Sequence, residues 1–177
     1  MTKSKSDHPL VRSAIRIAEV SHAGRGRTSP GTMYLTHSRR VAEVVASCDS
    51  VTEIDVAAAM LLGVLTDTPV GAGELTSRLI ASGADAGVAE TVVGLVSEVT
   101  EAFHCEDKLA SASDRSKRIM LCDRIVRLTS GVMPSEMLPT YLAACDVVFD
   151  TAGDADVLLA GWLIHEVNKR RNERPEK

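Results

Sequence analysis

The apolar residues of this chain recur at intervals of three and four, and this spacing constrains the fold more than any other feature. After Pro9, for example, Leu10, Val11, Ala14 and Ala18 fall on one face of a helix, and Pro9 suits its first turn. No stretch alternates apolar and polar residues as a half-buried strand does. The sequence therefore predicts an all-α domain of about eight helices.

Caps and turn residues set the expected boundaries. Ser50 followed by Glu53 is a capping box, so we expect a central, strongly apolar helix from there to Leu65. A flexible loop is expected over 102–112, and polar tails over 1–8 and 172–177 on either side of a domain spanning 9–171. The predicted helices cover residues 9–24, 37–48, 50–65, 73–82, 85–100, 114–129, 135–151 and 155–171.

Composition narrows the class of protein. A chain of 177 residues that is 45% hydrophobic can bury the core of one ordinary domain. A formal net charge of −4 argues against nucleic-acid and membrane-surface partners, which require a dense basic field. The four cysteines form no C-x-x-C pair and no window is apolar enough to span a bilayer. We therefore expect a cytoplasmic protein with reduced thiols.

Three short motifs carry the functional information. They are Ser21-His22-Ala23-Gly24 with Arg25 and Arg27, Gly31-Thr32-Met33-Tyr34-Leu35-Thr36-His37, and Leu121-Cys122-Asp123-Arg124. Their order and spacing resemble those of the HD-domain alarmone hydrolases, which include small (p)ppGpp hydrolases and the hydrolase half of RelA/SpoT-type enzymes. The resemblance covers roughly residues 10–130 and implies an HD-type helical bundle.

The resemblance implies a metal centre. In the family, a histidine, a His-Asp pair and a later aspartate hold one divalent ion, typically manganese, which removes the 3′-pyrophosphate of the alarmone. Such an ion polarises a phosphoryl oxygen and lowers the pKa of its bound water. By this resemblance His37 matches the first histidine and Asp123 the last aspartate.

The His-Asp pair between them is missing. The run from Leu61 to Thr68 is one residue shorter than the family pattern, so that only Gly63, Val64 and Leu65 stand where the ligands belong. His37 and Asp123 are therefore interpreted as a vestigial, incomplete metal site. We expect no cofactor, or manganese or another divalent ion if the protein is active.

Other positions of the resemblance are altered as well. Thr66 and Asp67 occupy the place of the family's Glu-Asp dyad, so one of its two carboxylates remains. A helix-ending polar turn is at least as good an interpretation of Asp67 as a catalytic role. Each expected ligand-binding residue could instead be a solvated or packed side chain. For Arg27 the two interpretations carry equal weight. These residues are Arg27, Thr28, Tyr34, Lys117, Arg118 and Arg127.

Three functions follow from this pattern. The first is a degenerate hydrolase homologue, a pseudoenzyme that binds a guanine nucleotide or another phosphate ligand, or a protein partner. The second is a metal-dependent nucleotide pyrophosphohydrolase whose site has been rebuilt from His22, His104 or Cys105. The third is a structural interaction module with a collapsed pocket. A homodimer is compatible with all three.

Overall fold

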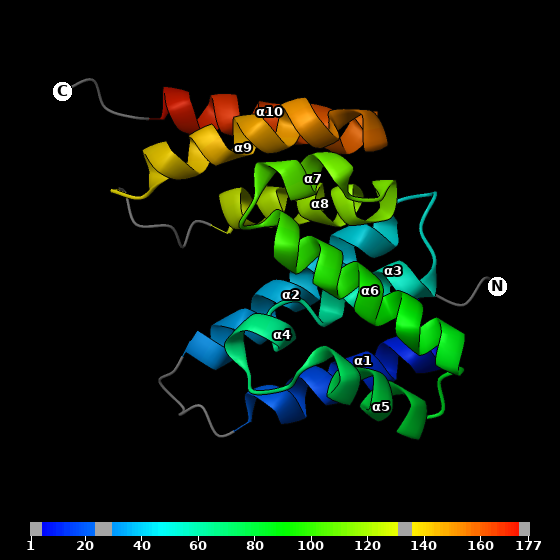
Figure 1. The fold of residues 1–177 in the computed structure, drawn as a ribbon. Coiled ribbons are helices and arrows are strands. Elements are labelled where there is room, and N and C mark those ends of the chain that lie inside the picture. Colours follow the sequence, from blue (N-terminus) through cyan, green and yellow to red (C-terminus); the bar gives the residue numbers. More distant parts are fainter. Residues whose placement is uncertain (1–4, 24–29, 131–135, 174–177) are drawn as a thin grey trace.

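The computed structural model describes residues 5–23, 30–130 and 136–173, which form helices joined by turns and short loops, with no strand among them (Figure 1). This confirms the prediction of an all-α bundle. In these ranges eight helices have eight residues or more, and α4 and α7 are shorter. The elements are η1 (Lys5–Asp7), α1 (Pro9–His22), α2 (Pro30–Ser47), α3 (Glu53–Met60), α4 (Val64–Asp67), α5 (Ala72–Ala81), α6 (Ala86–Ala102), α7 (Glu106–Ser111), α8 (Asp114–Thr129), α9 (Leu138–Ala152), η2 (Gly153–Ala155) and α10 (Val157–Asn172).

Two predicted boundaries were wrong near the first two motifs. The second helix begins at Pro30 rather than near His37, since a proline at the first helical position loses no hydrogen bond. The capping box of α3 is not Ser50 with Glu53. Instead the Asp55 carboxylate accepts hydrogen bonds from the backbone N and the hydroxyl of Thr52, at 2.7 and 2.9 Å.

The third predicted helix is interrupted. It ends at Met60 instead of Leu65, and Gly63 then adopts a left-handed conformation with φ of 81° before the short helix α4. The expected loop over 102–112 was also wrong in part, because it contains α7. The break at Gly63 lies in the run that the resemblance aligns with the His-Asp pair.

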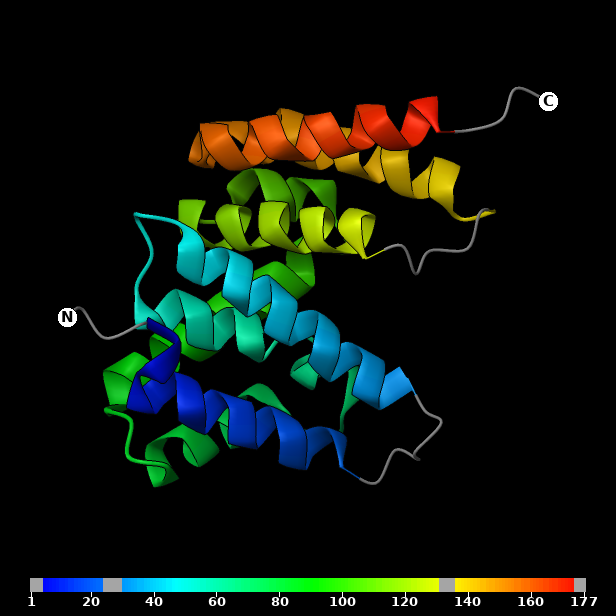
Figure 2. The same ribbon diagram turned by 180° about the vertical axis from the view of Figure 1, so that it is seen from behind.

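The helices form layers, which Figures 1 and 2 show from opposite sides. α9 and α10 form an outer layer against α8, and α1 and α5 lie at the opposite end. Between them α3 packs against α1, α2 and α6. As predicted, α3 is buried on most sides, with Val56 and Met60 only 1% exposed. One cluster of buried apolar side chains runs through these layers from Leu10 to Val167.

None of the helices in the described ranges has the length and apolar character that a bilayer span requires.

Candidate functional site

The site is built around a contact between α2 and α8. The Nε2 of His37 donates a hydrogen bond to Oδ1 of Asp123 at 2.6 Å, although the two residues lie 86 positions apart in the sequence. The side chain of Asp123 is 1% exposed and that of His37 is 16% exposed. The structure thus brings together the two residues that the resemblance assigns to one metal site.

Arg127 binds the same carboxylate from one helical turn further along α8. Its Nε lies 3.3 Å from Oδ1 and 3.1 Å from Oδ2 of Asp123. Burial alone would raise the pKa of Asp123, but the hydrogen bond from His37 and the charge of Arg127 outweigh it and lower the pKa to about 2. The carboxylate is thus ionised at neutral pH and neutralised by a guanidinium.

A second arginine lies beside this pair. The guanidinium of Arg124 is stacked between the rings of Phe103 and Tyr141, 5.2 and 5.1 Å from their centroids. Burial would lower the pKa of Arg124, but the surrounding groups, including Asp123, raise it overall. Arg124 thus adds a second positive charge near the carboxylate that Arg127 already pairs.

Two buried polar atoms of this cluster, the Nε of Arg124 and the hydroxyl of Tyr141, make no hydrogen bond of normal geometry within the described residues. Such groups normally bind a protein atom, a water or a ligand. Sequence reasoning missed Arg124, Tyr141 and Phe103 as neighbours of the site. The signal available for Arg124 was its position directly after Asp123 in the last motif.

The run that replaces the His-Asp pair lies next to His37. The hydroxyl of Ser38 donates to the carbonyl of Leu62 at 3.0 Å, which ties this run to α2. Leu61 and Val64 are fully buried and offer no donor atom from their side chains. The segment therefore contributes packing to the site and no metal ligand.

Asp67 closes the turn that precedes it. A Cβ added to Gly63 would lie 2.7 Å from the Oδ2 of Asp67, so this carboxylate lies over the glycine. In the described structure Asp67 makes no hydrogen bond or ion pair with His37 or Asp123. Its place agrees with the helix-ending turn that the sequence offered as the alternative.

The residues present do not fit the divalent ion that the family resemblance implies. Two ligands remain, and Asp123 is already bound by His37 and Arg127. No group of three His, Cys, Asp or Glu side chains in the described ranges is arranged to hold a metal. Of the proposed replacements, His104 and Cys105 are exposed between α6 and α7, and His22 is buried at the end of α1.

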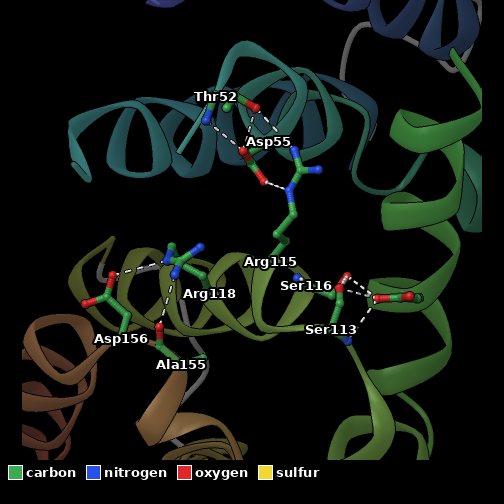
Figure 3. Close-up of polar contacts among 9 residues, drawn as sticks. Thr52, Asp55, Ser113, Arg115, Ser116, Arg118, Ala155 and Asp156 are labelled. Atoms are coloured by element: carbon green, nitrogen blue, oxygen red, sulfur yellow. Dashed lines mark hydrogen bonds and ion pairs between the residues drawn. The ribbon is translucent and has the colours of Figure 1, made fainter. Parts of the chain in front are cut away.

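The first half of α8 holds the helix in place (Figure 3). Arg115 reaches Asp55 on α3, with Nε 2.6 Å from Oδ1. Ser113 and Ser116 donate to the carboxylate of Glu98 on α6 at 2.6 and 2.7 Å. These contacts fix the position of α8, and through it the position of the buried carboxylate about two to three turns further on.

Arg118 belongs to the same framework and not to the cluster around Asp123. Its Nε lies 3.3 Å from Oδ2 of Asp156, and its NH2 group donates to the carbonyl of Ala155 at 3.1 Å (Figure 3). The structure thus does not bring Arg118 to the predicted ligand pocket. Lys117 is partly exposed on the same helix, and its side chain makes no hydrogen bond or ion pair with another described residue.

The remaining predicted ligand residues lie outside the described structure. Arg25, Arg27 and Thr28 fall in the segment 24–29, and although Tyr34 belongs to α2, its side chain is not among those described. Of the predicted ligand-binding residues, Arg127 is the one that the described structure places against the His37–Asp123 pair.

Comparison with known proteins leaves this site without a named counterpart: no family model matches the chain, and no curated protein matches it.

Proposed function

We propose that this protein binds a phosphorylated anion, such as a guanine nucleotide, without a metal, and that it acts as a sensor or scavenger rather than as a hydrolase. The observation that carries the proposal is the guanidinium of Arg127 on the carboxylate of Asp123. In the resembling hydrolases the position of Arg127 is an asparagine and the aspartate binds the metal. Here a side-chain cation neutralises the buried carboxylate in place of an ion.

The charge of the cluster favours an anionic ligand. Arg124 and Arg127 together exceed the single charge of Asp123, and Arg127 remains 40% exposed, so its remaining donors can reach a ligand. Guanidinium groups bind phosphate through paired, charge-assisted hydrogen bonds. His37, which is partly accessible, adds a donor or acceptor at the same edge. The cluster can therefore hold a phosphate.

A ligand screen by thermal unfolding tests this proposal. The protein is heated with inorganic pyrophosphate and with guanine and adenine nucleotides, including those with a 3′-pyrophosphate, in either manganese or a chelator. A ligand that binds the folded state raises the midpoint temperature of unfolding by mass action. At a ligand concentration one hundred times its Kd, the free energy of unfolding increases by about 3 kcal/mol. We expect at least one phosphate ligand to stabilise the protein equally in both conditions.

Two results would contradict the proposal in different ways. Stabilisation that requires manganese, together with release of pyrophosphate that is lost in His37→Ala, would establish the rearranged hydrolase. No stabilisation by any phosphate compound would leave the interaction module as the better account. A product assay on the same samples separates these outcomes.

A further inference from the structure

Two cysteine side chains from different helices meet where α2 packs against α8. Figure 2 shows the two helices side by side, α2 in blue to cyan and α8 in yellow-green. Cys48 directly follows the last residue of α2, and Cys122 lies in the middle of α8. The thiol of Cys122 donates a hydrogen bond to the sulfur of Cys48. Neither cysteine is in a disulfide, so the two helices hold a pair of thiols in contact.

Neighbouring residues place the same two helix faces together independently of the thiols. Val44 precedes Cys48 by four residues and Val126 follows Cys122 by four, so that each valine shares a helix face with its cysteine. Both valines line one pocket between α2, α8 and α10. The Sγ of Cys48 also donates to the carbonyl of Val44 at 3.4 Å, which keeps this thiol on the face that meets α8.

The two thiols differ in their access to solvent. Cys122 is fully buried inside α8, whereas Cys48 is half-buried at the end of α2. The exposed turn of Asp49 and Ser50 follows Cys48 directly. A small solute therefore meets Cys48 first, and Cys122 is held in place behind it. Because Cys48 lies beyond the last turn of its helix, its sulfur can also move towards Cys122 without breaking α8.

The surroundings of Cys48 favour its thiolate. The hydrogen bond from Cys122 lowers the pKa of Cys48 below its usual range, and this effect outweighs that of burial. The charges of Arg118 and Lys5 act in the same direction, whereas that of Asp156 opposes them. Lys5 is close because its Nζ donates to the carbonyl of Cys48 at 2.7 Å. The thiolate is the form that reacts with oxidants, and redox-sensing cysteines are accessible, acidic and next to a second thiol.

We propose that Cys48 and Cys122 are a redox modification site, a dithiol that a peroxide converts to a reversible disulfide between α2 and α8. First the Cys48 thiolate attacks a peroxide oxygen and the O–O bond breaks. The sulfur becomes a sulfenic acid, and the hydroxide that leaves takes up the thiol proton as water. The Cys122 sulfur then attacks the Cys48 sulfur, the S–O bond breaks, and the hydroxyl group leaves with the Cys122 proton as a second water. A dithiol reductant restores both thiols by exchange.

Peptide mapping of the folded full chain after treatment with hydrogen peroxide tests the disulfide. Remaining thiols are blocked with N-ethylmaleimide, and trypsin then places Cys48 in peptide 41–78 and Cys122 in peptide 119–124. We expect these two peptides to be linked in the monomer, and the link to disappear with dithiothreitol. In urea the preference for this pair should be lost, because the folded contact creates it. Links formed mainly through the exposed Cys105, or no intramolecular link, would overturn the proposal.

Single variants separate the roles of the two thiols. Cys48→Ser should abolish the link, whereas Cys145→Ser, at a buried cysteine of α9, is the matched control and should leave it unchanged. In Cys122→Ala the sulfenic acid of Cys48 cannot be resolved, so dimedone should trap about tenfold more of it than in the wild type. If Cys122→Ala does not fold, the wild-type peptide map decides alone. Equal trapping in both proteins, or equal loss of the link in Cys48→Ser and Cys145→Ser, would refute the assignment.

Discussion

At the scale of single residues, the ionisation of Asp123 links the site to the stability of the fold. Its carboxylate is buried, and a buried charge is tolerated only when it is paired and hydrogen-bonded. His37 and Arg127 both meet this requirement. The three side chains therefore depend on one another, and the removal of one leaves the others with uncompensated charge or an unpaired donor.

This dependence predicts how stability varies with pH. The pKa of Asp123 is lowered from 3.8 to about 2 in the folded state, so its contribution of about 2 kcal/mol is present above the unfolded pKa and is lost as the pH falls towards 2. Urea unfolding of the wild type should show this loss between about pH 5 and pH 2. Asp123→Asn should be less stable at pH 7 and should show a shallower decline over the same range.

The exposed residue Asp49 provides the control for this titration. Asp49→Asn should follow the wild-type pH dependence at nearly wild-type stability. If Asp123→Asn lost as much stability as the wild type between pH 5 and pH 2, the buried carboxylate would not be the group responsible.

At the scale of secondary-structure elements, the break between α3 and α4 depends on Gly63. A side chain at φ of 81° is strained by about 1–2 kcal/mol, and the new Cβ would also press on Asp67 at 2.7 Å. Gly63→Ala should therefore lower the free energy of unfolding by at least this amount. Gly73→Ala, in the first turn of α5 with open space around it, should be neutral or slightly stabilising.

The double variant Gly63→Ala with Asp67→Ala separates the two causes, because it removes the contact and keeps the backbone strain. We expect it to recover only part of the lost stability. Full recovery would show that the left-handed conformation is not required, and that the break in the helix has another origin.

Arg118 of α8 should contribute to the stability of the fold and not to anion binding. Arg118 is fully engaged with Asp156 and Ala155, so Arg118→Gln should destabilise the fold by about 1–3 kcal/mol, the range for breaking a hydrogen bond to a buried group. Anion affinity should not change. Paired urea unfolding and calorimetry of this variant measure both quantities, and a large loss of affinity in the folded protein would place Arg118 in the binding site after all.

The sequence predicted elements better than it predicted their interruptions. The predicted helix over 114–129 agrees with α8, because its apolar spacing is uninterrupted and Ser113 caps its first turn. The break at Gly63 was missed because it lies in a continuous apolar run. Such a run shows no helical periodicity, so the sequence pattern does not reveal where the helix is interrupted. Helix α7 was missed because its six residues are mostly exposed, so packing against α6 and α9 stabilises it rather than its own pattern.

The same limits apply to the site. Motif order brought His37 and Asp123 together correctly, because both lie on long helices of the predicted core. The role of Arg127 as the partner of Asp123 could be read from their i,i+4 spacing on α8. The stacking of Arg124 between Phe103 and Tyr141 could not, since it joins three elements whose packing no local pattern specifies.

At the scale of the whole molecule, the bundle separates a packed framework from a charged cluster. The contacts of Arg115, Arg118 and Glu98 hold α8 against its neighbours (Figure 3). Arg124 and Arg127 on the second half of the same helix carry the excess positive charge. The proposed anion-binding surface and the framework therefore use different residues of the same helix.

Calorimetric titration of a phosphate ligand in the presence of a chelator tests this account most directly. The ligand is inorganic pyrophosphate or the nucleotide that gives the largest thermal stabilisation, and the variants are Arg127→Gln and, as control, Arg16→Gln on the exposed face of α1. We predict binding without a metal. Its affinity should fall about tenfold or more in Arg127→Gln, a difference of about 1.4 kcal/mol in binding free energy, and should be unchanged in Arg16→Gln. The affinity should also decline as added salt screens the partly exposed charges. Binding that appears only with manganese, or that is insensitive to Arg127→Gln, would contradict it.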